Sequence, residues 1–283
     1  MRRIDKWKKV FKNHQFDLLD YYEEYLYLDE DVEIDFENDF IVLSVDISEG
    51  LKQDYSIIQI LRLEFDEQTH DIYYRQIGLF RSNEIGIEEF ADVVAELFDN
   101  FNEDRTKLLV EQNTFGDLLF KCIQINEEFE VPMESILKFK RNADDKKLIK
   151  GLRVNTQSRI VAVKAFKTLM DKNKIIIRES KTCEEVENFQ KNSKGKYEAS
   201  IGHDDTVTAL TNFSYFIQLA DTQLINWLED FYEYIGYEFN DEDARAAART
   251  QSMTEKEFDD IDESKLDNLD SDVAEYAKQM LGI

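Results

Sequence analysis

The apolar and polar positions divide the chain into strand-like and helix-like stretches, and the most apolar of the strand-like ones spans 40–47. Only Ser44 interrupts the apolar residues that precede Asp46. A run of this kind is typical of a strand that is covered on both faces of its sheet. Two further strands are predicted at 55–65 and 72–80, and because short connections join the three, we expect them to pair antiparallel.

Helical periodicity dominates the rest of the chain. Apolar residues recur at intervals of three and four, which predicts amphipathic helices; these span 87–101, 115–125, 156–171, 182–190, 204–219 and 222–234. Thr182 is the predicted N-cap of its helix, with Glu185 at the capping-box position. Short strands are predicted at 107–112, 135–140, 175–177 and 196–199. Residues 1–28 also have helical spacing, and the acidic residues 29–39 are predicted to form a loop.

The order of these elements predicts an α/β fold. Three antiparallel strands come first, and the strand–helix–strand units that follow should add parallel strands by right-handed crossovers, with helices on both faces of a mixed β-sheet. A ribonuclease H-like sheet has this order, with its first acidic residue on the central first strand. The predicted organisation is an N-terminal helical or linker segment (1–39), a ribonuclease H-like domain (40–238) and an acidic, flexible C-terminal tail (239–283).

The composition says more about the possible partners of the chain than about its fold. Its 283 residues carry a net charge of −26, which argues against non-specific binding of nucleic acid. The charge is uneven: residues 137–178 hold 13 lysines and arginines against 3 aspartates, whereas 240–272 hold 12 acidic residues against 4 basic ones. The first segment can therefore meet phosphates, and the second repels them. No apolar run reaches the ~18 residues of a membrane span, and two cysteines without a cluster favour a reducing compartment.

Acidic residues coincide with the ends of predicted elements. Asp46 lies near the end of the first strand, Glu111 lies near the end of the strand at 107–112, and Asp204 and Asp205 lie at the start of a helix. Any one of these carboxylates alone is well explained as a turn or helix-capping residue. Together at one edge of a sheet they predict a site for hard divalent cations, because a buried carboxylate is costly unless it is paired or bound to a metal.

Three further residues are candidates for supporting this site. Gly50 permits a turn that would fold Asp54 back toward Asp46. His203 adjoins the acidic pair, where it either orients a carboxylate, approaches a phosphate or serves as a structural loop residue. Asn113 lies at the predicted start of a helix, so it is equally a candidate N-cap.

The same residues carry a resemblance to a known family. The strings SVDISEG…DYS, LLVEQNTFGDLL and YEASIGHDDTVTAL follow one another within about residues 40–220. This series resembles the nuclease domain of the large terminase subunit of tailed bacteriophages, the DNA-packaging motor. The resemblance implies a ribonuclease H-like endonuclease that cleaves double-stranded concatemeric viral DNA with two Mg²⁺ or Mn²⁺ ions. It also implies that the catalytic metal ligands are Asp46, Glu111 and one or both of Asp204 and Asp205, with Asp54 as a further acidic residue.

Partners and a location follow from the resemblance as well. It implies double-stranded DNA as substrate, and the terminase ATPase domain, the small terminase subunit and the portal as partners, in the cytoplasm of an infected bacterial host and without a membrane. A full large terminase carries an N-terminal ATPase, but no G-x-x-x-x-G-K-[ST] loop occurs here. We therefore expect either an isolated nuclease domain or the product of a separate gene.

Two other functions fit the sequence. One is another ribonuclease H-like nuclease, such as a junction resolvase or an RNA–DNA hybrid nuclease, and the other is a packaging or assembly module with a degenerate site. For a nuclease, the basic segment supplies the expected contacts to DNA phosphates. These predicted contacts are Lys138, Lys140, Arg141, Lys146, Lys147, Lys150 and Arg153.

Overall fold

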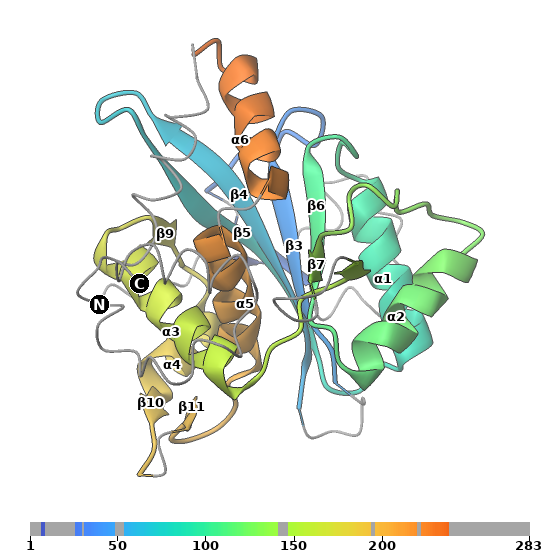
Figure 1. The fold of residues 1–283 in the computed structure, drawn as a ribbon, viewed down its shortest axis with the longest axis vertical. Helices are drawn as coiled ribbons and strands as arrows, with labels where there is room; N and C mark the ends of the chain where they lie inside the picture. The colour runs from blue at the N-terminus through green and yellow to red at the C-terminus, as the bar shows by residue number, and fades with distance from the viewer. Residues whose placement is uncertain are drawn as a thin grey trace.

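A mixed β-sheet forms the centre of the computed structural model, which describes residues 7–8, 26–29, 31–48, 54–140, 147–193, 196–219 and 222–237. Within these residues the strand order is β1-β2-β5-β4-β3-β6, with β9 beside β5 (Figure 1). The strands are β1 (Trp7–Lys8), β2 (Leu26–Asp29), β3 (Ile41–Asp46), β4 (Ser56–Asp66), β5 (Asp71–Ser82), β6 (Thr106–Val110) and β9 (Ile175–Ile176). Neighbours from β1 to β3 pair antiparallel, while β6 is parallel to β3 and β9 is parallel to β5.

Helices cover both faces of this sheet (Figure 1). On one face lie α1 (Ile87–Asp99) and α2 (Thr114–Ile125), and on the other lie α3 (Thr156–Asp171), α4 (Ser180–Asn188) and α5 (Asp205–Leu219). The last described helix, α6 (Thr222–Tyr234), packs its Trp227 and Phe231 rings against Phe40, next to the start of β3. The predicted mixed α/β sheet with helices on both faces, in ribonuclease H-like order, is therefore confirmed.

The alternation of side chains along β3 explains both its apolar run and its single polar residue. Leu43 and Val45 pack with residues of α1 and α2, whereas Val42 packs with residues of α3, α5 and α6. Ser44 shares the face of Val42, and its hydroxyl donates a hydrogen bond of 2.8 Å to the carbonyl oxygen of Ala209 in α5. Because this bond satisfies a buried hydroxyl, the helix can lie directly on the strand.

Two small hairpins accompany the sheet. β7 (Lys138–Lys140) pairs with β8 (Leu148–Lys150), and β10 (Phe189–Lys191) pairs with β11 (Tyr197–Ala199), both antiparallel. Just before β7, Ile136 pairs in parallel with Leu108 of β6. The strand predicted at 135–140 therefore does neighbour the strand that leads to Glu111. No helix in the described part of the chain has the length and apolarity needed to cross a lipid bilayer.

The helix predicted for residues 1–28 is wrong where the structure describes this segment. Both described stretches, β1 and β2, are strands of the central sheet, and Leu26 pairs with Phe80 of β5. Leu26 and Leu28 are buried in the core that also contains α1. Tertiary burial against β5 outweighs the weak helical spacing of this segment.

The predicted cap of α4 is also wrong. The helix begins earlier than predicted, and the carboxylate of Glu179 accepts hydrogen bonds from the backbone N–H groups of Lys181 and Thr182, at 2.8 and 2.7 Å. Thr182 instead lies buried in the first turn, where its hydroxyl donates to Glu179. The turn at Gly50 and the predicted C-terminal tail fall outside the described residues, and the three-part division of the chain stays a prediction.

Candidate functional site

Asp46 lies at the carboxyl end of β3, on the strand face that Ser44 presents to α5. Burial raises the pKa of Asp46 well above its usual value, and the negative charges of Glu111 and Asp205 raise it further. Arg159 opposes this effect as a nearby positive charge. An isolated turn aspartate would feel none of these charges, so Asp46 belongs to a cluster of carboxylates.

Glu111 reaches this cluster from the neighbouring strand. Because Val45 and Val110 are paired in the parallel β3–β6 ladder, the residues that follow them emerge at the same edge of the sheet. The Glu111 carboxylate accepts a hydrogen bond of 3.0 Å from the side-chain amide of Asn212 in α5, a residue that is only 1% exposed. Asn212 was not among the predicted site residues, because in the sequence it is one of several polar positions of its helix.

Asp204 and Asp205 lie at the start of α5, which the Ser44–Ala209 bond holds against β3. The Asp204 carboxylate accepts a hydrogen bond from the backbone N–H of Ala199 in β11, at 3.2 Å. The Asp205 carboxylate accepts one from the backbone N–H of Tyr55, just before β4, at 2.9 Å. The Asp204 carboxylate is therefore held by β11, and the Asp205 carboxylate is held by the residue before β4.

Burial, together with the negative charges of Glu185 and Asp54, raises the pKa of Asp205 to about 6, although the Tyr55 N–H and His203 favour its ionised form. Asp54, His203 and Asp205 offer ligand atoms that lie within 4.8 Å of one another. The His203 Nδ1 atom is 3.6 Å from the Asp205 carboxylate, and the His203 ring lies edge-on to that of Tyr55. The structure therefore places Asp54 and His203 beside Asp205, whereas the sequence predicts that Asp54 folds back toward Asp46.

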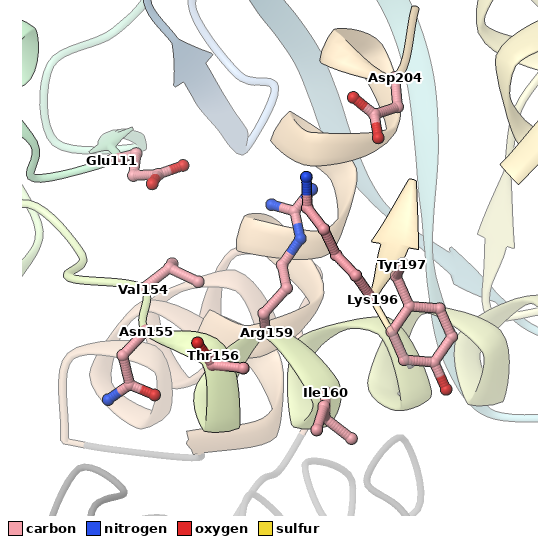
Figure 2. A pocket seen from close by; sticks show the side chains of 9 residues that line it. All are labelled: Glu111, Val154, Asn155, Thr156, Arg159, Ile160, Lys196, Tyr197 and Asp204. Carbon is pink, nitrogen blue, oxygen red and sulfur yellow. The ribbon is translucent and has the colours of Figure 1, made fainter. Parts of the chain in front are cut away.

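A cavity of about 540 Å³ opens beside the cluster (Figure 2). Its lining residues are Glu111, Val154, Asn155, Thr156, Arg159, Ile160, Lys196, Tyr197 and Asp204. Figure 2 shows the Arg159 and Lys196 side chains extending toward the space between Glu111 and Asp204. Arg159 was hidden among the 13 basic residues of 137–178, and only its position on α3 distinguishes it.

The donor set fits a hard divalent cation. Carboxylate oxygens dominate it, and these are the ligands that Mg²⁺ and Mn²⁺ prefer. The negative charges of Glu111 and Asp205 disfavour the ionised form of Asp46, and a bound cation would relieve that repulsion. The structure therefore brings Asp46 under the electrostatic influence of Glu111, Asp205 and Asp204, while the close group of possible ligand atoms among the described residues is that of Asp54, His203 and Asp205.

The remaining predicted residues occupy varied positions. The Asn113 side chain caps α2 by accepting hydrogen bonds from the N–H groups of Phe115 and Gly116, at 3.0 and 2.9 Å. The β7–β8 hairpin leads to Leu152, which pairs with Glu111. Lys138 and Lys140 lie half-buried in β7, Lys147 and Arg153 are exposed, and the Lys150 ammonium lies 5.9 Å from the Phe120 ring. Arg141 and Lys146 fall outside the described residues.

Gly116 sets the position of Glu111, and its replacement should disturb both fold and site. A Cβ atom added at Gly116 would lie 2.1 Å from the Glu111 carbonyl oxygen, a backbone atom that cannot move aside cheaply. We expect Gly116→Ala to lower the free energy of unfolding by about 1–3 kcal/mol, as overpacking in a core does. Urea denaturation measures this change. Gly86→Ala is the matched control, because an added Cβ there would meet its nearest neighbour at 3.6 Å; an equal loss in both variants would contradict the prediction.

No family model matches the chain. Its structure is similar to the large terminase nuclease from thermophilic phage G20c with bound magnesium, at 18% identity and a TM-score of 0.46, over 68% of this chain and 87% of that one. It is also similar to the large terminase nuclease domain of Thermus phage P74-26, at 16% identity and a TM-score of 0.45, over 66% and 83%. A form of the G20c nuclease with bound cobalt is similar at 16% identity and a TM-score of 0.45. These three solved structures are phage large terminase nucleases, the class that the sequence motifs resemble.

Proposed function

We propose that this protein is a metal-dependent endonuclease that cleaves double-stranded DNA. The observation that carries the proposal is the convergence of Asp46, Glu111, Asp204 and Asp205 at the carboxyl ends of β3 and β6 and the start of α5. Clustered carboxylates beside an open cavity suit phosphodiester hydrolysis with two divalent ions. The ordered motifs of the sequence support the same chemistry and suggest concatemeric viral DNA as the natural substrate.

In this proposal the residues of the site have different roles. Two Mg²⁺ or Mn²⁺ ions, when bound, supply the charge that activates a water molecule and stabilises the leaving 3′ oxygen. Asp46 would be the central metal ligand, because the charges of Glu111, Asp205 and Asp204 all act on it. Asn212 orients the Glu111 carboxylate, and the Tyr55 N–H orients that of Asp205. Carboxylates that are already fixed by hydrogen bonds lose little conformational freedom when metal and substrate bind.

A plasmid-nicking assay tests the proposal. Wild-type protein is incubated with supercoiled plasmid in Mn²⁺ or Mg²⁺, and the conversion to nicked and linear forms is followed on a gel. We expect metal-dependent conversion that EDTA stops. A parallel panel of linear duplex, four-way junction and RNA–DNA hybrid identifies the substrate class, and a preference for junctions or hybrids would replace the proposed substrate. Absence of cleavage on every substrate would favour an assembly module with a degenerate site.

DNA should lie along the β7–β8 hairpin, since this hairpin leads directly to Glu111. Lys147 just before β8 and Arg153 shortly after it are exposed, so we expect Lys147→Gln with Arg153→Gln to weaken duplex binding. Each lost phosphate contact should lower the slope of log Kd against log salt by roughly 0.9. Fluorescence anisotropy at several salt concentrations measures both quantities. Lys181→Gln, which removes an exposed cation paired with Glu184 on α4, is the control. Wild-type affinity and slope in the double variant would exclude this path.

A further inference from the structure

The cavity beside the carboxylates contains a cation whose hydrogen-bonding capacity is largely unused. Arg159 lies on α3, one turn after the Asn155 cap, and its side chain enters the cavity between Glu111 and Asp204 (Figure 2). Its guanidinium donates one hydrogen bond of 2.8 Å, to the hydroxyl of Thr208 in α5. Among the described residues, no carboxylate forms an ion pair with Arg159. A guanidinium has five N–H donors, and the bond to Thr208 uses one of them.

The position of Arg159 is fixed by the site itself. The Thr208 hydroxyl that accepts from Arg159 donates in turn to the backbone carbonyl oxygen of Asp204, at 3.0 Å. Thr208 is only 8% exposed, so this relay is shielded from competing water. The capping box formed by Asn155 and Ser158 fixes the first turn of α3. Arg159 is therefore anchored to the same end of α5 that presents the predicted metal ligands.

The positive charge of Arg159 favours the ionised form of Asp46, but its hydrogen bonding differs from that of a cation that only neutralises carboxylates. An arginine in that role usually forms a two-pronged ion pair with a carboxylate, whereas Arg159 stands beside the cluster and bonds to a neutral hydroxyl. Its free donors are planar and fixed in direction, which suits two oxygens of one phosphate group. Lys196, the other cation of the cavity, is exposed and paired with Glu198 at 3.3 Å, so it is held less firmly.

We propose that Arg159 binds a backbone phosphate of the DNA strand that enters the cavity, with Thr208 holding its guanidinium in place. The proposal rests on the proposed nuclease function and adds to it a phosphate-binding residue outside the basic hairpin. Arg159 would hold the strand against the carboxylates without contacting base edges, which is how phosphate contacts position DNA without reading its sequence.

Binding and metal response are measured separately to test this proposal. Duplex affinity is measured by fluorescence anisotropy in Ca²⁺, with a gel to verify that the DNA stays intact. We expect Arg159→Gln to raise Kd about tenfold or more, as loss of a charge-assisted hydrogen bond does, and to lower the log–log salt slope by roughly 0.9. Arg159→Lys should keep the slope but nick plasmid more slowly, because lysine keeps the positive charge but lacks the planar group that donates two parallel hydrogen bonds. Both variants should keep the rise in melting temperature that Mn²⁺ causes.

Lys167→Gln is the matched control, since it removes a cation from the exposed side of the same helix, where Lys167 pairs with Asp171. We expect wild-type affinity, slope and nicking in this variant. Wild-type Kd and slope in Arg159→Gln would overturn the proposal, and so would loss of its Mn²⁺ response, because Arg159 would then act by building the metal site. If the wild-type protein itself neither binds nor cleaves duplex DNA, the proposed function fails, and this inference fails with it.

Discussion

Replacing Asp46 with asparagine should abolish metal-dependent cleavage and, at the same time, make the metal-free protein more stable at pH 7. Cleavage is lost because Asp46 is a proposed metal ligand, and metal assistance contributes several kcal/mol to such reactions, which is about a thousandfold or more in rate. Stability rises because an ionised Asp46 is disfavoured by its burial and by the charges of Glu111 and Asp205. A neutral side chain of the same shape removes that repulsion.

Plasmid nicking and urea denaturation in EDTA measure the two effects. Asp66→Asn is the control, because Asp66 also ends a strand of the sheet, at the opposite end from Asp46, and its interactions with Gln68 and Thr69 lower its pKa. This control should cleave like the wild type and gain no stability. If Asp46→Asn nicked plasmid at the wild-type rate, Asp46 would not be a metal ligand. If it were less stable without metal, the carboxylates would not repel one another.

Acidity should stabilise the metal-free site, which is the opposite of the usual effect of acid on a protein. The pKa of Asp205 is about 6 in the folded protein and about 3.9 in an unfolded chain. Between these pH values Asp205 is protonated in the folded state but ionised in the unfolded state. The contribution of Asp205 to the free energy of unfolding is therefore most favourable below about pH 4 and falls as the pH rises to about 6. Two pKa units correspond to about 3 kcal/mol. The raised pKa of Asp46 acts in the same direction.

The difference between wild-type protein and Asp205→Asn isolates this contribution. In EDTA we expect the free energy of unfolding of the variant, relative to that of the wild type, to rise by about 3 kcal/mol from pH 4 to pH 7. The other titrating groups are common to both proteins, so their effects cancel in this difference. Metal should reverse the trend, since carboxylate ligands bind it only when deprotonated. Mn²⁺ should therefore raise the melting temperature of the wild type at pH 7 but not at pH 4.5, and at lower concentration than Mg²⁺ does. A pH-independent difference between the two proteins would show that Asp205 titrates normally.

The sheet and its acidic edge are predictable from the sequence because both depend on strong, local patterns. The apolar run before Asp46 identifies a strand covered on both faces, and the helical periodicity of 156–171 and 222–234 matches the bounds of α3 and α6. Parallel β3 and β6 then place Asp46 and Glu111 at one edge. By contrast, β2 has no strand pattern of its own and is a strand because β5 offers it an edge.

The residues that support the carboxylates could not be predicted in the same way. Asn212 and Thr208 look like ordinary polar positions of a helix, and only the packing of α5 on β3 directs them to Glu111 and Arg159. The cap of α4 fails for a related reason. A threonine followed three residues later by glutamate satisfies the local capping rule, but Thr206 of α5 supplies the backbone and hydroxyl donors that bind the Glu185 carboxylate.

The bond between Ser44 and Ala209 joins residues 165 positions apart, and this separation determines when the carboxylates come together. Contacts between distant residues form slowly, because the intervening chain must first give up its freedom. Domains fold as they emerge from the ribosome, beginning at the N-terminal side. A nascent chain that ends before α5 already contains Asp46 and Glu111, but Asp204 and Asp205 have yet to be synthesised. Any metal affinity that needs all four residues therefore first appears after α5 has been synthesised and has docked on β3.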